Sequence, residues 1–318
     1  MPDSMITDRP LVSVITVTYN SSLYVRDAIE SVLAQTYTNI EYIIGDDCSI
    51  DNTWDIICSY NDARIKKYRN KTNIGEYPNR NTAIGMSTGK FIIFIDGDDL
   101  IYNHGIEIYL RYANMFPDAG MTIQKKEFNN VVFPYLFEPR DILLNFFNGI
   151  NILESSFGSN FYKARILKQY MLPESFIQGD AFIRLKMSCR NSTLIIPGSL
   201  TWIRETPGQA SSKLNGYTGV VDEIHLIKEI IENDISNCLN SEEIESIYYA
   251  LYNRNKKVAL LNLLKGNISI FIQVIKYVFY LKAKIKNKHS IKNFDFLNLK
   301  YFGPQNPLKL INKEKIFP

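Results

Sequence analysis

The sequence predicts an α/β protein with a parallel, doubly wound sheet, because apolar strands and amphipathic helices alternate along its first third. Residues 11–17 form a near-continuous apolar run interrupted by Ser13 and Thr16, the pattern of a central parallel strand. Residues 91–95 form a second run, rich in β-branched and aromatic side chains. Strands separated by helices of this length favour right-handed crossovers and a sheet covered on both faces.

The other elements of this region have their own sequence signals. From residue 23, apolar positions recur at helical spacing, and Ser21 or Ser22 is available as the N-cap. The helix before the second apolar run is expected to stop at Gly89, a suitable C′ residue. We expect the remaining strands at residues 41–45 and 64–69 and a helix at residues 79–87. Residues 51–53 offer capping side chains for a further helix that runs through Trp54, Ile57 and Cys58.

An acidic turn follows the second apolar run directly. Asp96 and Asp98 can fall on the same side of an extended chain, Asp99 follows them, and Gly97 allows a ligand to approach the backbone. Such a pair suits Mg²⁺ or Mn²⁺, which complete their shells with waters and substrate phosphate oxygens. The alternative is a plain acidic surface turn. A calcium loop fits less well, because Leu100 stands where an oxygen ligand is needed.

The acidic turn has polar counterparts after two other strands. Tyr19 follows the first strand and Asp47 follows the strand predicted at residues 41–45. In doubly wound sheets, ligands bind beyond the carboxyl ends of the strands. We therefore expect Tyr19, Asp47 and Asp98 to cluster at that edge of the sheet.

Four motifs in this region occur in a defined order. They are V-S-V-I-T-V-T-Y-N at 12–20, G-D-D-C-S-I-D-N-T at 45–53, N-I-G followed by N-R-N within 73–81, and D-G-D-D at 96–99. Together they resemble glycosyltransferase family 2, the inverting nucleotide-sugar transferases of GT-A fold, strongly over residues 11–120 and loosely over 150–210. Cys48 replaces the usual glycine of the second motif. The resemblance implies a doubly wound, mixed, mainly parallel sheet flanked by helices.

The resemblance also implies roles for individual residues. It assigns nucleotide-sugar binding to Thr18, Tyr19, Asp47, Arg80, Asp96, Gly97 and Arg204, and metal binding to Asp96 and Asp98. Asp47 would accept a hydrogen bond from the uracil imide N–H, and Tyr19 would pack against the base. Arg80 would lie near the nucleotide, and Arg204 would lie in a loop that closes over the donor diphosphate. The implied cofactor is a divalent metal, Mn²⁺ or Mg²⁺.

Each of these residues also has a structural alternative. Asp47 would then be a helix N-cap, and Tyr19 would only form the turn after the first strand. Arg80 would be an exposed helical arginine, and Arg204 would form a surface salt bridge.

The segment 176–186 resembles the family's E-D element and supplies the candidate general base. Gly179 stands where the glutamate is usual, which leaves Asp180 as the candidate. Apolar positions after Asp180 predict a helix that begins there. The alternative role for Asp180 is a first-turn helix carboxylate stabilised by the dipole, worth about 0.3 to 1 kcal/mol.

The resemblance implies an inverting transfer of a sugar, a hexose or N-acetylhexosamine, from a nucleotide-diphosphate donor, expected to be a UDP-sugar, to an acceptor hydroxyl. The expected setting is bacterial surface polysaccharide (O-antigen or capsule) synthesis on a lipid-linked saccharide acceptor. A non-catalytic nucleotide-sugar-binding partner subunit is the alternative, which Gly179 permits. A dehydrogenase is disfavoured, because no G-x-G-x-x-G follows the first strand.

Length and composition agree with one catalytic domain and a helical extension. The chain has 318 residues and a net charge of +3, too small to indicate a nucleic-acid partner. We expect a disordered leader at 1–9, a GT-A catalytic domain at 10–215 and a helical extension at 216–318. Within the catalytic domain, 10–120 would bind the nucleotide sugar and 121–215 the acceptor. Aromatic residues are dense at 125–175 and would recognise the acceptor or pack in the core.

The C-terminal region raises the question of membrane contact. Residues 268–281 are mostly apolar but too few for a transmembrane helix of about twenty residues, and Lys282, Lys284, Lys286 and Lys288 follow. Such a basic helix lies on an anionic membrane surface or packs against the catalytic domain. The four cysteines show no paired spacing, and no apolar signal-peptide core is seen. We expect a cytoplasmic protein, with peripheral contact at the inner face of the plasma membrane through the basic helix.

Overall fold

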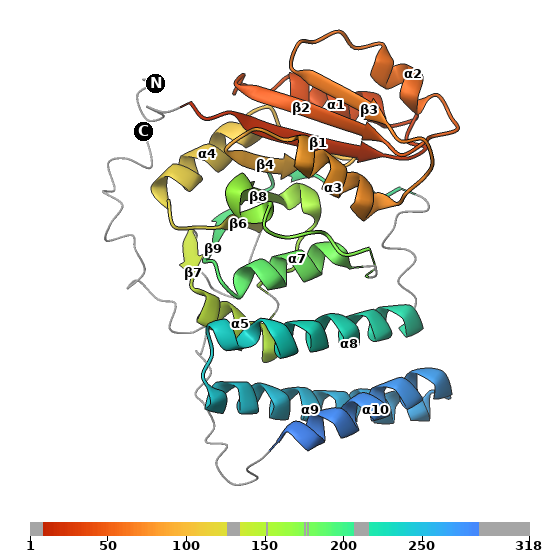
Figure 1. Cartoon of the computed structure of the whole chain (residues 1–318), viewed down its shortest axis with the longest axis vertical. Helices are drawn as coiled ribbons and strands as arrows, with labels where there is room; N and C mark the ends of the chain where they lie inside the picture. The colour runs from red at the N-terminus through yellow and green to blue at the C-terminus, as the bar shows by residue number, and fades with distance from the viewer. Residues whose placement is uncertain are drawn as a thin grey trace. The chain divides into compact units, whose positions relative to one another are not determined.

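The computed structural model describes residues 9–125, 134–150, 152–174, 176, 178–206 and 216–285. The chain divides into two compact units (Figure 1). Unit 1 comprises Met1–Lys126, Ser155–Ser175 and Asn191–Pro207, and unit 2 comprises Glu127–Glu154, Phe176–Arg190 and Gly208–Pro318. This division interrupts the segment 10–215 that we expected as the catalytic domain, and the domain boundaries stay a prediction.

Unit 1 is built on a mixed sheet with the strand order β3-β2-β1-β4-β8-β6-β9. Neighbouring strands are parallel except at β8, which runs antiparallel to both β4 and β6. The sheet is therefore mixed and mainly parallel, as predicted. The strands are β1 Val12–Thr18, β2 Ile40–Asp46, β3 Ile65–Arg69, β4 Phe91–Phe94, β6 Met121–Lys125, β8 Asn160–Lys163 and β9 Thr193–Pro197.

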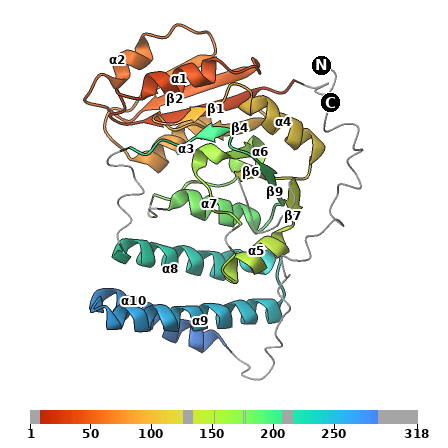
Figure 2. The ribbon, with the colours of Figure 1, turned by 180° about the vertical axis from the view of Figure 1, so that it is seen from behind.

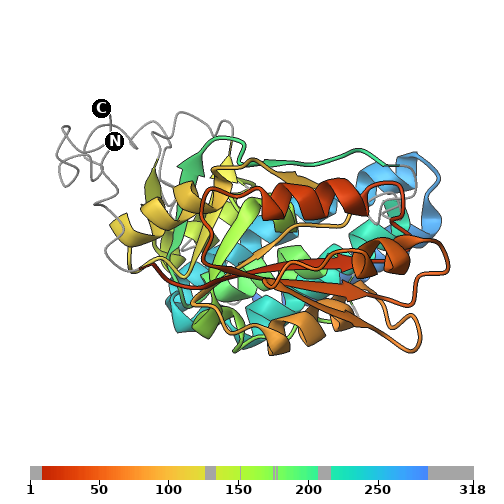
Figure 3. The ribbon, with the colours of Figure 1, turned by 90° about the horizontal axis from the view of Figure 1, so that it is seen from above.

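Every residue of β1 is buried, which explains its near-continuous apolar sequence. Ile15 is opposite Ile43 of β2 on one side and Phe94 of β4 on the other. Helices α1 and α3 lie on opposite faces of this part of the sheet (Figure 3). The helices of unit 1 are α1 Val25–Leu33, α2 Thr53–Cys58, α3 Glu76–Met86, α4 Gly105–Met115, the 3₁₀ turn η1 Phe157–Ser159 and α6 Ala164–Leu167.

Two local predictions were wrong. The N-cap residue of α1 is Tyr24, and no side-chain cap bond forms. Ser21 and Ser22 instead donate their backbone N–H groups to Thr53 Oγ1 and Asp51 Oδ2, which ties this loop to the start of α2.

The second wrong prediction concerns Gly89. The preceding helix ends at Met86, and its C-cap Ser87 is extended with ψ 142°. A Cβ at Gly89 would lie 2.6 Å from Ser13 N and 2.8 Å from Leu11 O. The glycine therefore permits a close approach to β1 and does not terminate the helix.

Glu41 anchors the opposite edge of the sheet, where β1 and β2 begin. Its buried carboxylate accepts hydrogen bonds from Ser13 Oγ at 2.5 Å, Lys66 Nζ at 2.6 Å and Thr88 N at 2.5 Å. Gly89 N donates to the same carboxylate at 3.0 Å. Burial raises the pKa of Glu41, but these hydrogen bonds outweigh it and lower the pKa to about 2.

Unit 2 contains the C-terminal helices, α8 Gly216–Asn233, α9 Ser241–Leu264 and α10 Ile268–Lys284 (Figure 2). It also contains β7 Tyr135–Phe137, α5 Pro139–Phe147, α7 Gly179–Ser188 and the 3₁₀ turn η3 Ile235–Asn237. A capping box opens α9: Glu243 N donates to Asn240 Oδ1, and Asn240 N donates to Glu243 Oε2. Arg140 of α5 pairs with Glu243 at 2.5 Å.

The apolar face of α10 is buried within unit 2. Ile270, Val274 and Val278 form a core cluster with Ala259 of α9, and Ile224 of α8 packs against it. None of the described helices is long and apolar enough to cross a membrane. Of the basic residues predicted to follow α10, residues 286 and 288 lie outside the described part of the chain.

Candidate active site

The loops after β1, β2 and β4 meet at the carboxyl edge of the sheet in unit 1. Thr18 is opposite Asp46 in the register of β1 and β2, and Asp47 N donates to Thr18 O at 2.8 Å. A Cβ at Gly97 would lie 3.1 Å from Thr18 Cβ and 3.3 Å from Ser21 Oγ. The acidic turn therefore packs directly against the end of β1, as the strand order predicts.

Arg80 is the buried cation of this edge. Its side chain is 2% exposed, so the alternative of an exposed helical arginine is wrong. Nη2 lies 2.6 Å from Asp96 Oδ1 and 3.0 Å from Glu76 Oε1. The guanidinium carbon also lies 4.3 Å from the ring centroid of Phe157 and 5.3 Å from that of Phe94.

Burial and ion pairing shift the pKa values of both Arg80 and Asp96. Burial alone lowers the pKa of a guanidinium, but Asp96 and Glu76 raise the pKa of Arg80, which stays charged. Burial raises the pKa of Asp96, and Arg80 opposes that change. Arg80 Nη1 is buried with no hydrogen-bond partner among the described residues, so this edge retains an unused charged donor.

Asp98 and Asp99 are held by residues 203–206, which follow the short strand β10 Thr201–Trp202. Thr206 Oγ1 donates to Asp98 Oδ2 at 2.9 Å, and Arg204 N donates to Asp99 Oδ1 at 2.9 Å. Arg204 Nε also donates to the carbonyl oxygen of Asp98 at 2.9 Å. Two residues far apart in the sequence, Arg204 and Thr206, therefore fix the conformation of the acidic turn.

Asp99 differs from its neighbours in its burial. Its side chain is almost fully buried, and burial together with the charge of Asp96 raises its pKa to about 7, while the hydrogen bond from Arg204 N opposes the rise. Asp98 is only half-buried. Of the three carboxyl groups of the turn, Asp99 is therefore enclosed, and Asp96 and Asp98 are partly accessible.

The donor set at the turn fits a hard divalent cation. Asp96 and Asp98 supply carboxylate oxygens, and the partner of Asp98 is a hydroxyl group, which leaves its charge in place. Asp98 is therefore the better ligand, since Asp96 is already paired with Arg80. No group of three or more His, Cys, Asp or Glu side chains suited to a metal occurs among the described residues. A cation here would need further oxygen ligands from water or substrate.

Asp47 is buried and anchors the loop between β3 and α3. Oδ1 accepts from Asn70 Nδ2 at 2.8 Å and Ile74 N at 3.0 Å, and Oδ2 accepts from Gly75 N at 2.8 Å. The N-cap residue of α2 is Asn52, so the N-cap alternative for Asp47 is wrong. Each carboxylate oxygen offers two lone pairs, so Oδ2 keeps acceptor capacity for a ligand.

Tyr19 and Thr18 differ in exposure. The Tyr19 side chain is 48% exposed, which leaves its ring accessible, and Thr18 is buried with its hydroxyl unpaired among the described residues. The space beside Gly97 is filled by Thr18 and Ser21. The glycine therefore serves packing against β1, a role that our ligand-approach argument did not include.

Arg204 forms an ion pair with an exposed carboxylate on α1. Nη2 lies 2.9 Å from Asp27 Oδ2, which is the surface salt bridge given above as the alternative. Its guanidinium carbon lies 4.8 Å from the Tyr24 ring centroid and 4.9 Å from that of Trp202. The role of Arg204 at a donor diphosphate stays a prediction, and residues 207–215 of its loop lie outside the described part of the chain.

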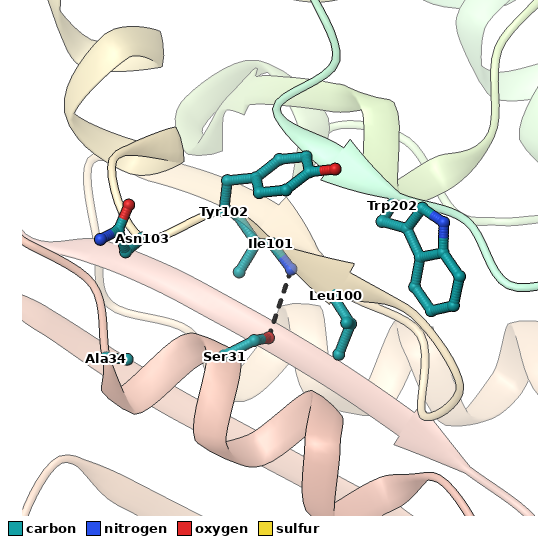
Figure 4. Close-up of a pocket in the computed structure, with 7 residues that line it drawn as sticks. All are labelled: Ser31, Ala34, Leu100, Ile101, Tyr102, Asn103 and Trp202. Atoms are coloured by element: carbon teal, nitrogen blue, oxygen red, sulfur yellow. Dashed lines mark hydrogen bonds between the residues drawn. The ribbon is translucent and has the colours of Figure 1, made fainter.

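A small ribbon beside the acidic turn joins these loops. Strands β5 Leu100–Ile101 and β10 Thr201–Trp202 pair antiparallel. Strand β5 follows Asp99 directly, and β10 leads into the segment that carries Arg204, so the pairing brings these two parts of the chain together. Ile101 N donates to Ser31 Oγ of α1 at 3.2 Å (Figure 4). The ribbon borders an open pocket of about 560 Å³, lined by Ser31, Ala34, Leu100, Ile101, Tyr102, Asn103 and Trp202.

Asp180 lies in unit 2, in the first turn of α7. Its Oδ2 is 2.9 Å from Arg184 Nη1, one helical turn later. The Arg184 side chain is almost fully buried, whereas that of Asp180 is partly exposed. The predicted helix is therefore present, with Asp180 in its first turn. The role of Asp180 as a base stays a prediction.

The aromatic segment predicted for acceptor recognition is largely core. Of its residues, Phe137, Phe147, Phe157, Phe161 and Tyr162 are buried. Phe161 stacks on Phe91 and Tyr109, with ring centroids 4.9 and 5.1 Å apart. Residues 126–133 of this segment lie outside the described part of the chain.

Sequence reasoning gave no individual role to Glu76, Thr206 or Trp202, although Trp202 and Thr206 belong to the segment 202–212 expected to close over the donor diphosphate. Glu76 opens α3 one turn before Arg80, a spacing at which a pair could have been expected. Thr206 and Trp202 reach the site only through the β10–β5 pairing. No short-range pattern indicates that contact.

The mixed sheet with polar loops at its carboxyl edge defines an α/β protein of GT-A fold. The profile of glycosyl transferase family 2 matches residues 13–186, and the chain belongs to this family. Among solved structures, TarS 1–349 of S. aureus in complex with UDP-GlcNAc is similar, with TM-score 0.65, 22% identity, and 86% of this chain and 88% of TarS 1–349 covered. The mannosyltransferase PcManGT from Pyrobaculum calidifontis, in complex with GDP-Man and Mn²⁺, has TM-score 0.56 at 15% identity and covers 88% of each chain. At these identities the likeness establishes the fold alone.

Curated relatives match the N-terminal region. The Escherichia coli UDP-Glc:alpha-D-GlcNAc-diphosphoundecaprenol beta-1,3-glucosyltransferase WfaP is 45% identical over 89 residues, 28% of this chain and 36% of WfaP. The putative teichuronic acid biosynthesis glycosyltransferase TuaG of Bacillus subtilis (strain 168) is 43% identical over 93 residues, 29% of this chain and 37% of TuaG. The match therefore spans little more than a third of either relative.

Proposed function

We propose that the protein is an inverting glycosyltransferase that moves a sugar from a UDP-sugar donor to a hydroxyl group of a lipid-linked saccharide. The observation that carries the proposal is the set of Asp47, Arg80, Asp96 and Asp98 at one edge of a GT-A sheet. Asp47 suits the uracil imide N–H, and Asp98 would hold a divalent cation that would balance the charge of a diphosphate. The relatives named for glucosyl transfer and teichuronic acid synthesis support a role in surface polysaccharide synthesis.

On the donor side, the reaction needs stabilisation of the negative charge that develops on the departing diphosphate. Asp96 and Asp98 would hold a divalent cation, Mn²⁺ or Mg²⁺, which when bound stabilises negative charge on the departing diphosphate. Arg80 holds Asp96 in position through the 2.6 Å ion pair and opposes the rise of its pKa. Arg204 and Thr206 hold the acidic turn by hydrogen bonds, so little reorganisation is needed when the donor binds.

The acceptor side needs one base. The bond between the anomeric carbon and the diphosphate oxygen breaks, and its electron pair leaves with the nucleoside diphosphate. The acceptor oxygen forms the new bond from the opposite face and releases its proton. We assign that proton to the Asp180 carboxylate, which is partly exposed in the first turn of α7.

The setting follows from the acceptor chemistry. A saccharide on a lipid diphosphate is held at a membrane surface, and nucleotide sugars are soluble. We therefore propose a cytoplasmic location with peripheral contact at the inner face of the plasma membrane.

A second candidate is a non-catalytic nucleotide-sugar-binding subunit. Two observations favour it: Gly179 replaces the glutamate of the family's E-D element, and Asp180 is paired with the buried guanidinium of Arg184 at 2.9 Å. The ion pair occupies a carboxylate oxygen that transfer would need for the acceptor proton. This candidate would retain donor binding and lose transfer.

One assay separates the two candidates. Release of nucleoside diphosphate is measured with a panel of UDP-, GDP- and dTDP-sugars, Mn²⁺ or Mg²⁺, and a synthetic lipid-diphosphate saccharide acceptor. Acceptor-dependent release of UDP supports the glycosyltransferase. Tight donor binding in calorimetry without acceptor-dependent release supports the binding subunit, and release of GDP alone refutes the uridine assignment.

A further inference from the structure

The turn between α9 and α10 presents an apolar surface away from the core of unit 2. We call residues 260–272 the α9–α10 tip; it can be followed in Figure 1. Its exposed apolar side chains are Leu260, Leu261, Leu263, Leu264, Ile268 and Ile272, and Leu264 is 74% exposed. Solvent-exposed apolar side chains gathered at one turn indicate an interaction surface.

The apolar residues of α10 are thus divided between two surfaces. Ile270, Val274 and Val278 are buried in the three-helix core, whereas Ile268 and Ile272 are exposed at the tip. The buried face of α10 cannot at the same time lie on a membrane. Most of the exposed apolar side chains described in unit 2 lie at the tip, which includes α9 leucines that the basic-helix interpretation did not consider.

The leucines of α9 form a broad end surface. At about 100° per residue, Leu260, Leu261, Leu263 and Leu264 occupy about 160° of the helix circumference. Lys256 and Lys257 precede Leu260 and Leu261 by four residues, which is about 6 Å along the helix. Both lysines are exposed, so charged groups stand on the same side as the leucines, one turn farther from the tip.

The charge carried by the tip's own stretch of chain has a single sign. Residues 246–285 contain no Asp or Glu, and their basic residues are Arg254, Lys256, Lys257, Lys265, Lys276, Lys282 and Lys284. Arg254 is paired with Glu223 of α8 at 2.8 Å. Lys265 lies in the turn itself and is exposed.

We propose that the α9–α10 tip inserts into the interfacial layer of an anionic lipid bilayer. Apolar side chains of interfacial segments enter about 5 to 10 Å into the headgroup and acyl boundary, which matches one helical turn of leucines. Lys256, Lys257 and Lys265 would then lie at the level of the anionic headgroups. The proposal does not depend on the transfer reaction, since it rests on unit 2 alone.

A second copy of the chain is the less suitable occupant of this surface. In a two-fold contact the same patch meets itself, so Lys256, Lys257 and Lys265 of each copy would face like charges. An anionic bilayer supplies charges of the opposite sign to the same lysines. Charge complementarity therefore selects the lipid surface.

Vesicle sedimentation with the full chain tests the proposal. The probes are vesicles of pure phosphatidylcholine and vesicles containing about 30% phosphatidylglycerol. We expect binding to the anionic vesicles, and at least about tenfold weaker partitioning of the double variant Leu260→Gln/Leu264→Gln. The double variant Lys256→Gln/Lys257→Gln should show a similar loss of partitioning. Its partitioning should also depend less on salt concentration, because two positive charges have been removed.

A matched control separates the tip from the rest of α10. Phe279 is 64% exposed on the same helix but eleven residues beyond Ile268, about 16 Å along the axis. Phe279→Gln should change partitioning less than about twofold. All of these side chains are exposed, so melting temperatures should match that of the parent and exclude misfolding as the cause.

Other outcomes would overturn the proposal. A larger loss for Phe279→Gln than for Leu260→Gln/Leu264→Gln would indicate that α10 lies flat on the bilayer. Absence of vesicle binding, together with an oligomer in sedimentation velocity that the leucine variant dissociates, would assign the tip to a contact between copies. Equal binding to the phosphatidylcholine vesicles and to the anionic vesicles would contradict the proposed contact of the lysines with anionic headgroups.

Discussion

The Arg80 guanidinium and the Asp96 carboxylate form an ion pair of 2.6 Å at the carboxyl edge of the sheet. Arg80 is almost fully buried, and Glu76 supplies its second carboxylate. Phe94 and Phe157 flank the guanidinium carbon, so the charge is enclosed by rings as well as by carboxylates. The arginine is therefore a fixed part of the acidic turn.

Arg80→Met should destabilise the protein by about 1 to 3 kcal/mol, because it leaves the partly exposed carboxylates of Asp96 and Glu76 without their cation. Arg80 lowers the pKa of Asp96, so its loss should raise that pKa further and move the acid limb of the activity profile to higher pH. Urea unfolding and pH–rate profiles measure both effects. Arg111→Met, which breaks an exposed pair with Glu107, is the matched control and should cost less than about 1 kcal/mol. Equal costs for the two variants would refute the buried-pair argument.

Asp98→Ala should reduce kcat at least about 100-fold and abolish its dependence on Mn²⁺ or Mg²⁺, since Asp98 is a partly exposed carboxylate whose hydrogen bond comes from a hydroxyl group. Diphosphate release measured across a metal titration tests this. The exposed Asp118→Ala serves as the control and should titrate like the parent. Undiminished activity of Asp98→Ala in the presence of a chelator would contradict the metal assignment.

Asp47 should make the protein prefer uridine over cytidine nucleotides by at least about 100-fold in affinity, because cytosine offers no imide N–H to a buried carboxylate. Calorimetry with UDP and CDP measures the difference. Asp47→Asn keeps an acceptor oxygen for Asn70 and Ile74 but loses the acceptor for Gly75 N, so two of the three hydrogen bonds that hold the loop should persist while the preference falls. Equal affinities of the parent for UDP and CDP would rule out this role.

Asp180→Asn should lower kcat by about 10²- to 10⁴-fold with little change in nucleotide affinity, as expected for loss of a general base. The asparagine keeps an oxygen that can accept from Arg184, so α7 should remain intact. Single-turnover transfer and UDP calorimetry separate the two effects. Near-parental transfer would place the base elsewhere, and Glu174 and Glu154 would be tested next.

Glu41 should make the protein sensitive to acid. Its pKa is lowered from 4.5 in the unfolded chain to about 2 in the fold, so its stabilisation is fully present above about pH 4.5 and is lost as the pH falls toward 2. The shift corresponds to about 3 kcal/mol. Urea unfolding of Glu41→Gln between pH 3 and 7 should show lower stability at pH 7 and a flatter pH dependence. A slope as steep as that of the parent would mean that other groups control acid unfolding.

Short-range sequence patterns were sufficient to predict the central strands of unit 1. The apolar run 11–17 became β1 because both faces of that strand are covered, and a covered strand has no polar side to interrupt the run. Asp47 follows β2 and Asp98 follows the end of β4, and both strands are parallel neighbours of β1. Their loops therefore meet at one edge of the sheet by topology alone. The family motifs identified the same residues independently.

Local capping was predicted poorly, because several residues compete for the same bonds. Ser21 and Ser22 satisfy the pattern of an N-cap, yet their backbone N–H groups bond to Thr53 and Asp51. Gly89 satisfies the pattern of a helix terminator, yet it is needed for the approach to Ser13. In both cases a long-range contact decided the local conformation.

The sequence by itself determined the alternation of strands and helices, the family, and the positions of the carboxylates Asp47, Asp96 and Asp98. These depend on hydrophobic period and on residues close together in the chain. Only the tertiary structure decided that Arg80 is enclosed by Asp96, Glu76 and Phe157, and that Thr206 reaches Asp98. It also decided which apolar residues of α10 are buried and which remain at the tip. The physical reason is that burial depends on which other segments cover a side chain, and those segments lie far away in the sequence.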